Sequence, residues 1–209
     1  MFSTKHTLSI LSVFAISAFA GSAFAEDVPG ADGVKDVTFG GGKSYIKFVS
    51  TAPAEVIKGT SPDIKGQVKF NMDALEETTG ELSVEVKTLD TGNKMRDRHL
   101  AGKDWLNAKK NPKITFTIEG LKNIKQTEAT KKKTVYTATT VGKITVNGVA
   151  KATEAPVTIT IGAGGGKIKV EPKFVVKLAD HNVAGKKGAV GDKVGEKIDI
   201  EGLVYGKAK

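Results

Sequence analysis

Apolar and polar residues alternate with a period of two along most of the chain, and no stretch of comparable length has a helical period. Clear examples lie at 82–86, 114–118 and 157–161, where Leu, Val, Ile or Phe occupies every second position. Because successive side chains of a strand point to opposite faces, this pattern predicts an all-β fold of half-buried strands. The candidate strands are 45–50, 64–71, 81–89, 113–120, 134–147, 155–161, 167–178 and 196–205.

Residues that favour turns separate these eight candidate strands, among them Ala52-Pro53, Ser61-Pro62, Asn111-Pro112 and Asn147-Gly148. Eight antiparallel strands joined in this way form either a sandwich or a closed barrel. Several of the strands are nine residues or longer, which corresponds to about 30 Å at roughly 3.3 Å per residue. This length favours an elongated barrel.

Some positions expected to face the interior of the barrel carry small side chains. Ala138, Thr140 and Gly142 share a candidate strand with the larger Tyr136 and Ile144. An unfilled apolar space loses dispersion contacts and lowers stability. Since an eight-stranded barrel is wide enough to hold one small ligand, we expect a guest molecule to fill the space.

The clearest segment without strand character, residues 90–107, lies between the third and fourth candidate strands. Asn93 is suited to cap a short helix, Gly102 to end it, and Asp104 to cap a second short turn. Two interpretations of this insertion stay open. It is either a plug that only fills the barrel end or a lid that contacts a ligand. Its apolar side chains are Met95, Leu100, Trp105 and Leu106.

The first 25 residues have the features of a secretory signal peptide. Lys5 precedes an apolar stretch over 8–20, and Ala23-Phe24-Ala25 places small residues where a signal peptidase reads them. Serines interrupt the apolar stretch, which is too short for a membrane anchor. We therefore expect cleavage after Ala25 and a periplasmic protein, with release from the cell left open. The expected division is a signal peptide over 1–25, a linker over 26–35 and one barrel domain over 36–209.

The formal net charge of +9 raises the question of a polyanionic partner. The lysines alternate with apolar residues, as in Lys167-Ile168-Lys169-Val170, and this spacing is typical of the solvated face of a sheet. We therefore expect no nucleic acid as partner. A weaker possibility stays open, in which the positive charge draws the protein into peripheral contact with anionic lipid head groups. A homodimer stays open as the oligomeric state.

Residues suited to catalysis are few. The absence of cysteine excludes disulfides, thiolate metal sites and cysteine nucleophiles. Beyond the signal peptide there are four serines and only two histidines, His99 and His181, without a nucleophile-elbow or HExxH motif. We expect a protein that is not an enzyme and has no metal or cofactor. His181, in a glycine-rich loop, is expected to be exposed.

One long motif resembles a known family. It consists of Thr91-Gly92-Asn93, Arg96-Asp97-Arg98-His99-Leu100, Trp105-Leu106-Asn107 and Asn111-Pro112-Lys113-Ile114-Thr115-Phe116, with a further match at 142–149. On these residues the chain resembles the YceI family of periplasmic polyisoprenoid-binding proteins over about 36–205. The resemblance implies an extended, lipocalin-like, eight-stranded antiparallel β-barrel. It also implies that this barrel encloses the tail of a polyisoprenoid or a fatty-acid derivative without catalysis.

The expected role is transport, storage or sequestration of that amphiphile in the periplasm. The alternative is an interaction module of the envelope or stress response that uses the barrel only as a scaffold. Arg96, Arg98 and His99 are candidates for the head group, because a guanidinium binds phosphate or carboxylate through paired donors. In a second interpretation, Arg96 and Asp97 fasten the insertion to the barrel rim. The candidates for the lumen and lid are Phe48, Phe70, Val84, Val86, Met95, Leu100, Trp105, Leu106, Phe116, Ile118, Tyr136, Ile144 and Phe174.

Overall fold

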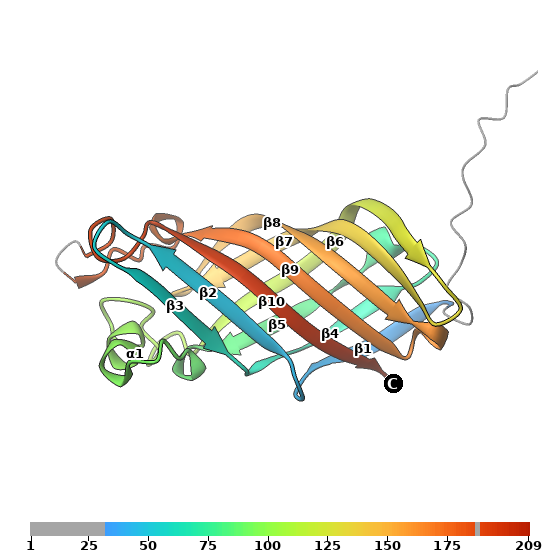
Figure 1. The fold of residues 1–209 in the computed structure, drawn as a ribbon, viewed down its shortest axis with the longest axis horizontal. Helices are drawn as coiled ribbons and strands as arrows, with labels where there is room; N and C mark the ends of the chain where they lie inside the picture. Colours follow the sequence, from blue (N-terminus) through green and yellow to red (C-terminus); the bar gives the residue numbers. More distant parts are fainter. Residues whose placement is uncertain (1–31, 187–188) are drawn as a thin grey trace, which may run out of the picture.

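The computed structural model describes residues 32–186 and 189–209, and this part of the chain is built almost entirely of antiparallel strands (Figure 1). The predicted signal peptide and most of the predicted linker lie outside the described residues. No helix within the described ranges is long and apolar enough to cross a membrane. The strands are β1 (Val34–Gly40), β2 (Tyr45–Thr51), β3 (Val56–Ser61), β4 (Ile64–Asn71), β5 (Thr79–Glu85), β6 (Lys113–Ala129), β7 (Lys133–Val146), β8 (Val149–Gly162), β9 (Lys167–Lys177) and β10 (Lys197–Ala208).

The strands close into a barrel because β10 pairs with the first segment of the chain along its whole length. Its carboxyl end pairs with β1 and its amino-terminal half with β2, so that β1 and β2 act as two halves of one bent strand. β4 and β3 follow in the same way beside β1 and β2. The ten strands assigned in the described chain therefore occupy eight positions around the ring, which confirms the predicted eight-stranded antiparallel barrel.

Two of these strands were not predicted. β1 begins at Val34, two residues before the predicted start of the domain, and buries Val37 and Phe39. β3 has a weak apolar signal because Gly59 occupies one of its positions, and the structure gives the reason. A side chain there would collide with the ring of Phe48, which lies directly over Gly59.

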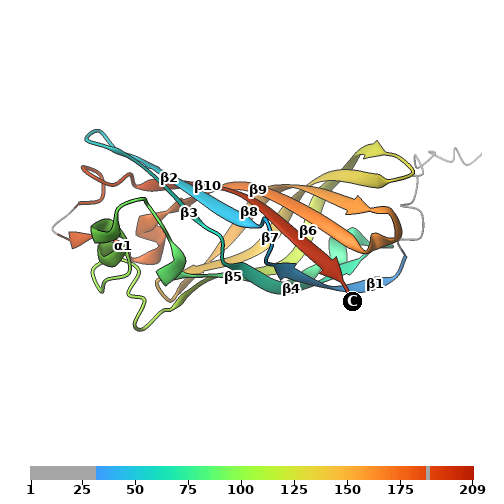
Figure 2. The same ribbon diagram turned by 60° about the horizontal axis from the view of Figure 1, so that its bottom comes forward.

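One short helix, α1 (Lys94–Leu100), lies in the insertion that joins β5 to β6, which we define as residues 86–112. β5 and β6 are the third and fourth of the strands predicted from sequence, so the helix is where the pattern placed it along the chain. Figures 1 and 2 both show α1 at one end of the barrel, the end that also holds the β2–β3 turn and the β9–β10 loop. The shorter 3₁₀ turns are Leu75–Glu77, Val86–Thr88, Ala163–Gly165 and Leu178–His181.

The end of the barrel opposite α1 is filled by its own side chains. Phe39 and Phe70 pack with their ring centroids 6.1 Å apart, and Ile159, Ile161 and Ile168 are each at most 2% exposed. These residues belong to one continuous apolar cluster. A second cluster lies toward the α1 end, where Val176 of β9 and Leu178, just after β9, belong to the same apolar cluster as Leu106 of the insertion.

The filled end should behave as an ordinary close-packed core. We expect Ile161→Ala to lower the free energy of unfolding by about 2–5 kcal/mol, because it removes buried methyl groups and leaves a cavity. Val175, 48% exposed on β9, is the matched control, and Val175→Ala should change stability by less than about 0.5 kcal/mol. Urea unfolding followed by circular dichroism measures both values. Equal effects would contradict the packing described here.

Candidate functional site

A cavity of about 500 Å³ occupies the half of the barrel nearer α1. This volume lies in the range of pockets that bind small organic ligands. Its wall is made almost entirely of apolar side chains from the barrel strands, with further residues from the insertion and the β9–β10 loop. The strand residues include Ile46, Phe48, Ile57, Ile64, Leu82, Val84, Ile114, Phe116, Ile118, Ile144, Val146, Val157, Val170, Phe174, Val176, Ile198, Ile200 and Val204.

Most residues expected to contact a ligand line this cavity. Among them, Phe116 of β6 and Phe174 of β9 pack against each other in the cavity wall, with ring centroids 6.0 Å apart in an edge-on arrangement. Of the head-group candidates, Arg96 and His99 line the cavity. The other lining residues among those expected are Phe48, Val84, Met95, Leu100, Trp105, Leu106, Ile118 and Ile144.

Four of the expected residues do not line the cavity. Phe70 and Tyr136 belong to the cluster at the filled end of the barrel, and Val86 is buried behind the cavity wall beside Leu106. Arg98 lies on α1 outside the cavity. Alternation correctly places Phe70 and Tyr136 on the inner face of their strands, but it does not show which end of a strand is already filled. Val86 was predicted within a strand and instead lies in the 3₁₀ turn that follows β5.

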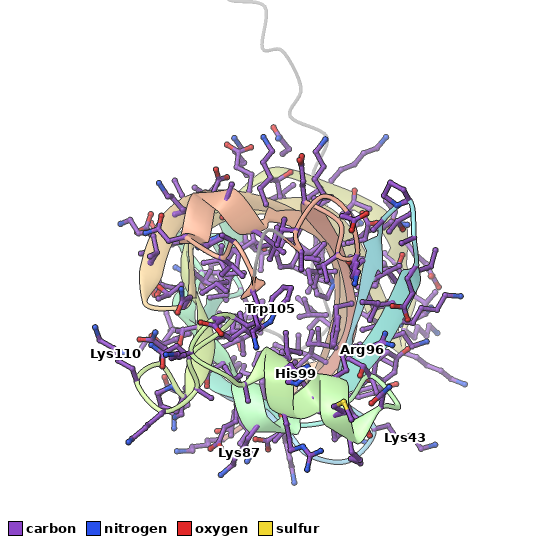
Figure 3. The ribbon with its side chains drawn as sticks, turned by 90° about the vertical axis from the view of Figure 1, so that its left-hand side faces the viewer. Lys43, Lys87, Arg96, His99, Trp105 and Lys110 are labelled. Carbon is purple, nitrogen blue, oxygen red and sulfur yellow. The ribbon has the colours of Figure 1, made fainter. Side chains whose placement is uncertain are left out.

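Three segments that are distant in sequence surround the open end of the cavity, which we call the mouth. They are the β2–β3 turn (52–55), the insertion, and the described part of the β9–β10 loop (178–186 and 189–196). The turn contacts the loop through a hydrogen bond from the Ala54 amide to the Asp192 carbonyl at 3.4 Å. It contacts the insertion through an ion pair between Glu55 and Arg96 at 2.7 Å. In Figure 3, Trp105 lies in the opening with His99 and Arg96 beside it, whereas Lys87 and Lys110 point outward.

Local hydrogen bonds hold α1 in place at the mouth. The Asn93 side chain accepts hydrogen bonds from the Met95 and Arg96 amides at 3.0 and 3.2 Å, which confirms the predicted cap. Asp97 accepts from the Thr91 amide and hydroxyl at 2.9 and 2.7 Å. Burial alone would raise the pKa of Asp97, but these two bonds together with Lys94 lower it on balance.

After α1 the insertion continues as a series of turns, so the second short helical turn expected at Asp104 does not form a helix. The Leu106 amide donates to the Leu100 carbonyl at 3.1 Å and thereby folds this segment back against α1. Leu106 is buried in the apolar cluster at the mouth, and Trp105 is partly buried beside it. The insertion therefore supplies part of the cavity wall, as a lid would.

Trp105 packs directly on the backbone of the β9–β10 loop at Gly185. A Cβ built on Gly185 would lie 2.7 Å from the indole ring, and the backbone φ there is +71°. Both observations require glycine, because a side chain would collide with the ring and L-residues rarely adopt this φ. Because the partner of Trp105 at this contact is a glycine, hydrophobic patterning of the sequence does not reveal the contact.

Three of the residues that sequence analysis considered for catalysis, Ser44, Ser50 and His181, bond to backbone groups. Ser50 Oγ accepts from the Gly195 amide at 2.8 Å, and Ser44 Oγ accepts from the Tyr205 amide at 3.0 Å. His181 is only 2% exposed, with Nδ1 at 2.8 Å from the Val149 carbonyl, so the expectation that it is exposed was wrong. Its ring is held between the β9–β10 loop and β8. Within the described ranges, no three His, Asp or Glu side chains are placed to hold a metal ion.

Comparison with known proteins identifies the family. The sequence model of the YceI-like domain matches residues 38–203. The chain belongs to this family. A UPF0312 protein of Photorhabdus laumondii subsp. laumondii is 29% identical over 153 residues, which cover 69% of this chain and 72% of that protein.

Solved structures of two other proteins share the fold of this YceI-like chain. BcnA of Burkholderia cenocepacia superposes with a TM-score of 0.65 at 24% identity, covering 78% of this chain and 96% of BcnA. A polyisoprenoid binding domain from Saccharophagus degradans, implicated in plant cell wall breakdown, superposes with a TM-score of 0.62 at 10% identity. That match covers 83% of this chain and 98% of the domain. The barrel is thus retained while most side chains differ.

Trp105, the single tryptophan of the chain, makes its contact with Gly185 measurable. We expect Gly185→Ala to displace the indole ring into solvent, shift its fluorescence emission to longer wavelength and increase quenching by iodide. Gly164→Ala is the matched control, because Gly164 has a similar φ of +73° but no atom within 4 Å of a built Cβ. Both variants should lose about 1–3 kcal/mol from backbone strain, but only the first should change the emission. An unchanged emission in Gly185→Ala would show that the ring does not pack there.

Proposed function

We propose that this YceI-like protein binds a long-chain amphiphile, a polyisoprenoid or a fatty-acid derivative, with its tail inside the barrel. The observation that carries the proposal is the contrast between the two halves of one tube. The half around Phe39 and Phe70 is packed by the protein itself, whereas the half around Phe116 and Phe174 encloses an apolar cavity. An empty apolar cavity costs stability, and a hydrocarbon tail supplies the missing contacts.

The length of the cavity suits a tail better than a compact ligand. On β7 the cavity wall runs from Val146, beside the mouth, to Thr140 in the middle of the strand. These six residue steps correspond to about 20 Å along the strand. Burial of a tail contributes roughly 0.8 kcal/mol per CH₂ before the entropy of association is subtracted. Affinity should therefore depend on tail length, and specificity for the tail should be loose.

The neighbouring structure described as a polyisoprenoid binding domain supports an isoprenoid as one class of tail. A binding role without catalysis agrees with the site, since the hydroxyls of Ser44 and Ser50 hold backbone amides and the ring of His181 is turned to a backbone carbonyl. In this proposal the protein carries, stores or sequesters its ligand outside the cytoplasm.

Native mass spectrometry of the protein purified from its own host tests the proposal directly. We expect an additional mass that is released by organic solvent and identified as an amphiphile. A protein without such a mass that also takes up no fluorescent fatty acid or prenol would refute the proposal and leave the barrel as a scaffold for protein partners.

The export step rests on the first 25 residues and has its own test. We expect the protein isolated from its host to begin at Glu26, because Ala23 and Ala25 match the small-residue requirement of signal peptidase. N-terminal sequencing of the periplasmic and culture-medium fractions measures this and shows where the protein resides. A chain that keeps Met1 and stays with the cytoplasmic fraction would contradict export.

Tail length offers a quantitative test of the cavity. For unbranched alcohols of increasing length, affinity should rise with each added CH₂ and level off once the tail fills the cavity. Ala155, on β8 beside Thr140, lines the wall, and Ala155→Phe should move the levelling point to shorter tails. Displacement of a fluorescent probe measures the series.

The control for this series is Val175→Phe, which places the same ring on the outer face of β9, where Val175 is 48% exposed. It should leave the levelling point unchanged. Urea unfolding of both variants confirms that they are folded. A levelling point that is identical in the parent and in folded Ala155→Phe would show that the tail does not reach this part of the barrel.

A further inference from the structure

Charged side chains in the cavity wall lie only at the mouth. Among the described residues they are Glu55 of the β2–β3 turn, Arg96 of α1 and Lys193 of the β9–β10 loop. The contacts at the mouth bring their segments together. Glu55 pairs with Arg96 at 2.7 Å, and the amide of Ala54, the residue before Glu55, donates to the carbonyl of Asp192, the residue before Lys193. Glu55, Arg96 and Lys193 thus come from three segments that meet at the mouth.

This group has one more positive than negative charge, and the surplus is on Lys193. Across residues 32–186 and 189–209, the Lys193 ammonium has no ion-pair or hydrogen-bond partner. The neighbouring cation Lys94 differs, because it lies 3.6 Å from both Asp90 and Asp97 and is outside the cavity wall. Lys193 is exposed to solvent at the mouth and lines the cavity, whereas Lys94 lies on the outer surface of the insertion.

We propose that Arg96 and Lys193 bind an anionic head group, a carboxylate or a phosphate, on the amphiphile whose tail lies in the cavity. This inference rests on the proposed function and adds the chemical class of the head. Since the opposite end of the barrel is filled, a tail inside the cavity leaves its head at the mouth, beside these two side chains.

Glu55 acts in this arrangement as an internal competitor for Arg96. Its side chain is 46% exposed and that of Arg96 30% exposed, and ion pairs with this exposure contribute only about 0–1 kcal/mol. An incoming carboxylate or phosphate can replace Glu55, because a guanidinium accepts either anion through two parallel hydrogen bonds. A neutral head gains nothing from this exchange, and an ammonium head is repelled by both cations.

The test compares three ligands with the same tail: hexadecanoic acid, hexadecan-1-ol and hexadecylamine. Each displaces the neutral probe N-phenyl-1-naphthylamine from the delipidated parent protein. We expect the acid to bind roughly tenfold more tightly than the alcohol, which corresponds to about 1.4 kcal/mol, and the amine to bind most weakly. The advantage of the acid should shrink as sodium chloride is raised from about 0.05 to 0.5 M, because salt screens exposed charges.

Three substitutions separate the roles of the charges. Glu55→Gln should increase the preference for the acid by removing the competitor, whereas Lys193→Gln and Arg96→Gln should each reduce it toward parity. Lys103→Gln is the control, because Lys103 is an exposed cation of the same insertion that does not line the cavity. Affinity for the alcohol and the preference for the acid should both stay unchanged in Lys103→Gln, and urea unfolding checks that all four variants are folded.

The possible outcomes distinguish this inference from the proposed function. If acid and alcohol bind the parent equally, or if Glu55→Gln weakens the acid, the head-group site is refuted while tail binding stands. If none of the three ligands displaces the probe, both the site and the proposed function are refuted. Sodium phosphate alone should not displace the probe. It should also reduce the advantage of the acid no more than sodium chloride does at the same ionic strength. A larger effect would show a site for free anions and would also overturn the inference.

Discussion

Closure of the hydrogen-bonded ring is the constraint on which the rest of the molecule depends. β10 pairs with β9 on one side and with β1 and β2 on the other, so no strand of the ring is free to move inward. A barrel of eight positions has a nearly fixed width, and its interior must be filled by side chains, by water or by a guest. At one end the interior is filled by side chains that include Phe39, Phe70, Ile159, Ile161 and Ile168, whereas the other end encloses an apolar cavity.

The arrangement of the mouth follows from the same ring. Three connections that are far apart in sequence meet at the α1 end: the short β2–β3 turn, the insertion and the β9–β10 loop. Each loop contributes a different element: Glu55 comes from the turn, Arg96 and Trp105 from the insertion, and Gly185 and Lys193 from the β9–β10 loop. The scaffold is set by backbone pairing, and recognition is left to side chains on the loops.

Alternation in the sequence was sufficient to predict the class of fold, the number of positions in the ring and the place of the helix. It also placed Phe116, Ile118, Ile144 and Phe174 in the lumen, because a period of two assigns each residue to a face. It did not separate Phe116 from Phe70, since both follow the same pattern and only their partners across the sheet decide which end is filled. β3 was missed because Gly59, the position that accommodates Phe48, weakens its apolar signal. Sequence analysis did not identify Lys193 as a cavity residue or His181 as a buried one. Both lie in a loop, and the surroundings of a loop residue depend on which other segments the fold brings beside it.

The cavity has its opening at the mouth, and the far end is occupied by tightly packed aromatic and branched side chains. A second molecule therefore cannot push the first out from behind, and an occupied lumen has to empty before it can be reloaded. For a ligand bound as proposed, exchange would proceed at the rate at which the bound molecule leaves, however abundant the competitor is. A factor that accelerates release of such a ligand would therefore have to act on the three segments that form the mouth.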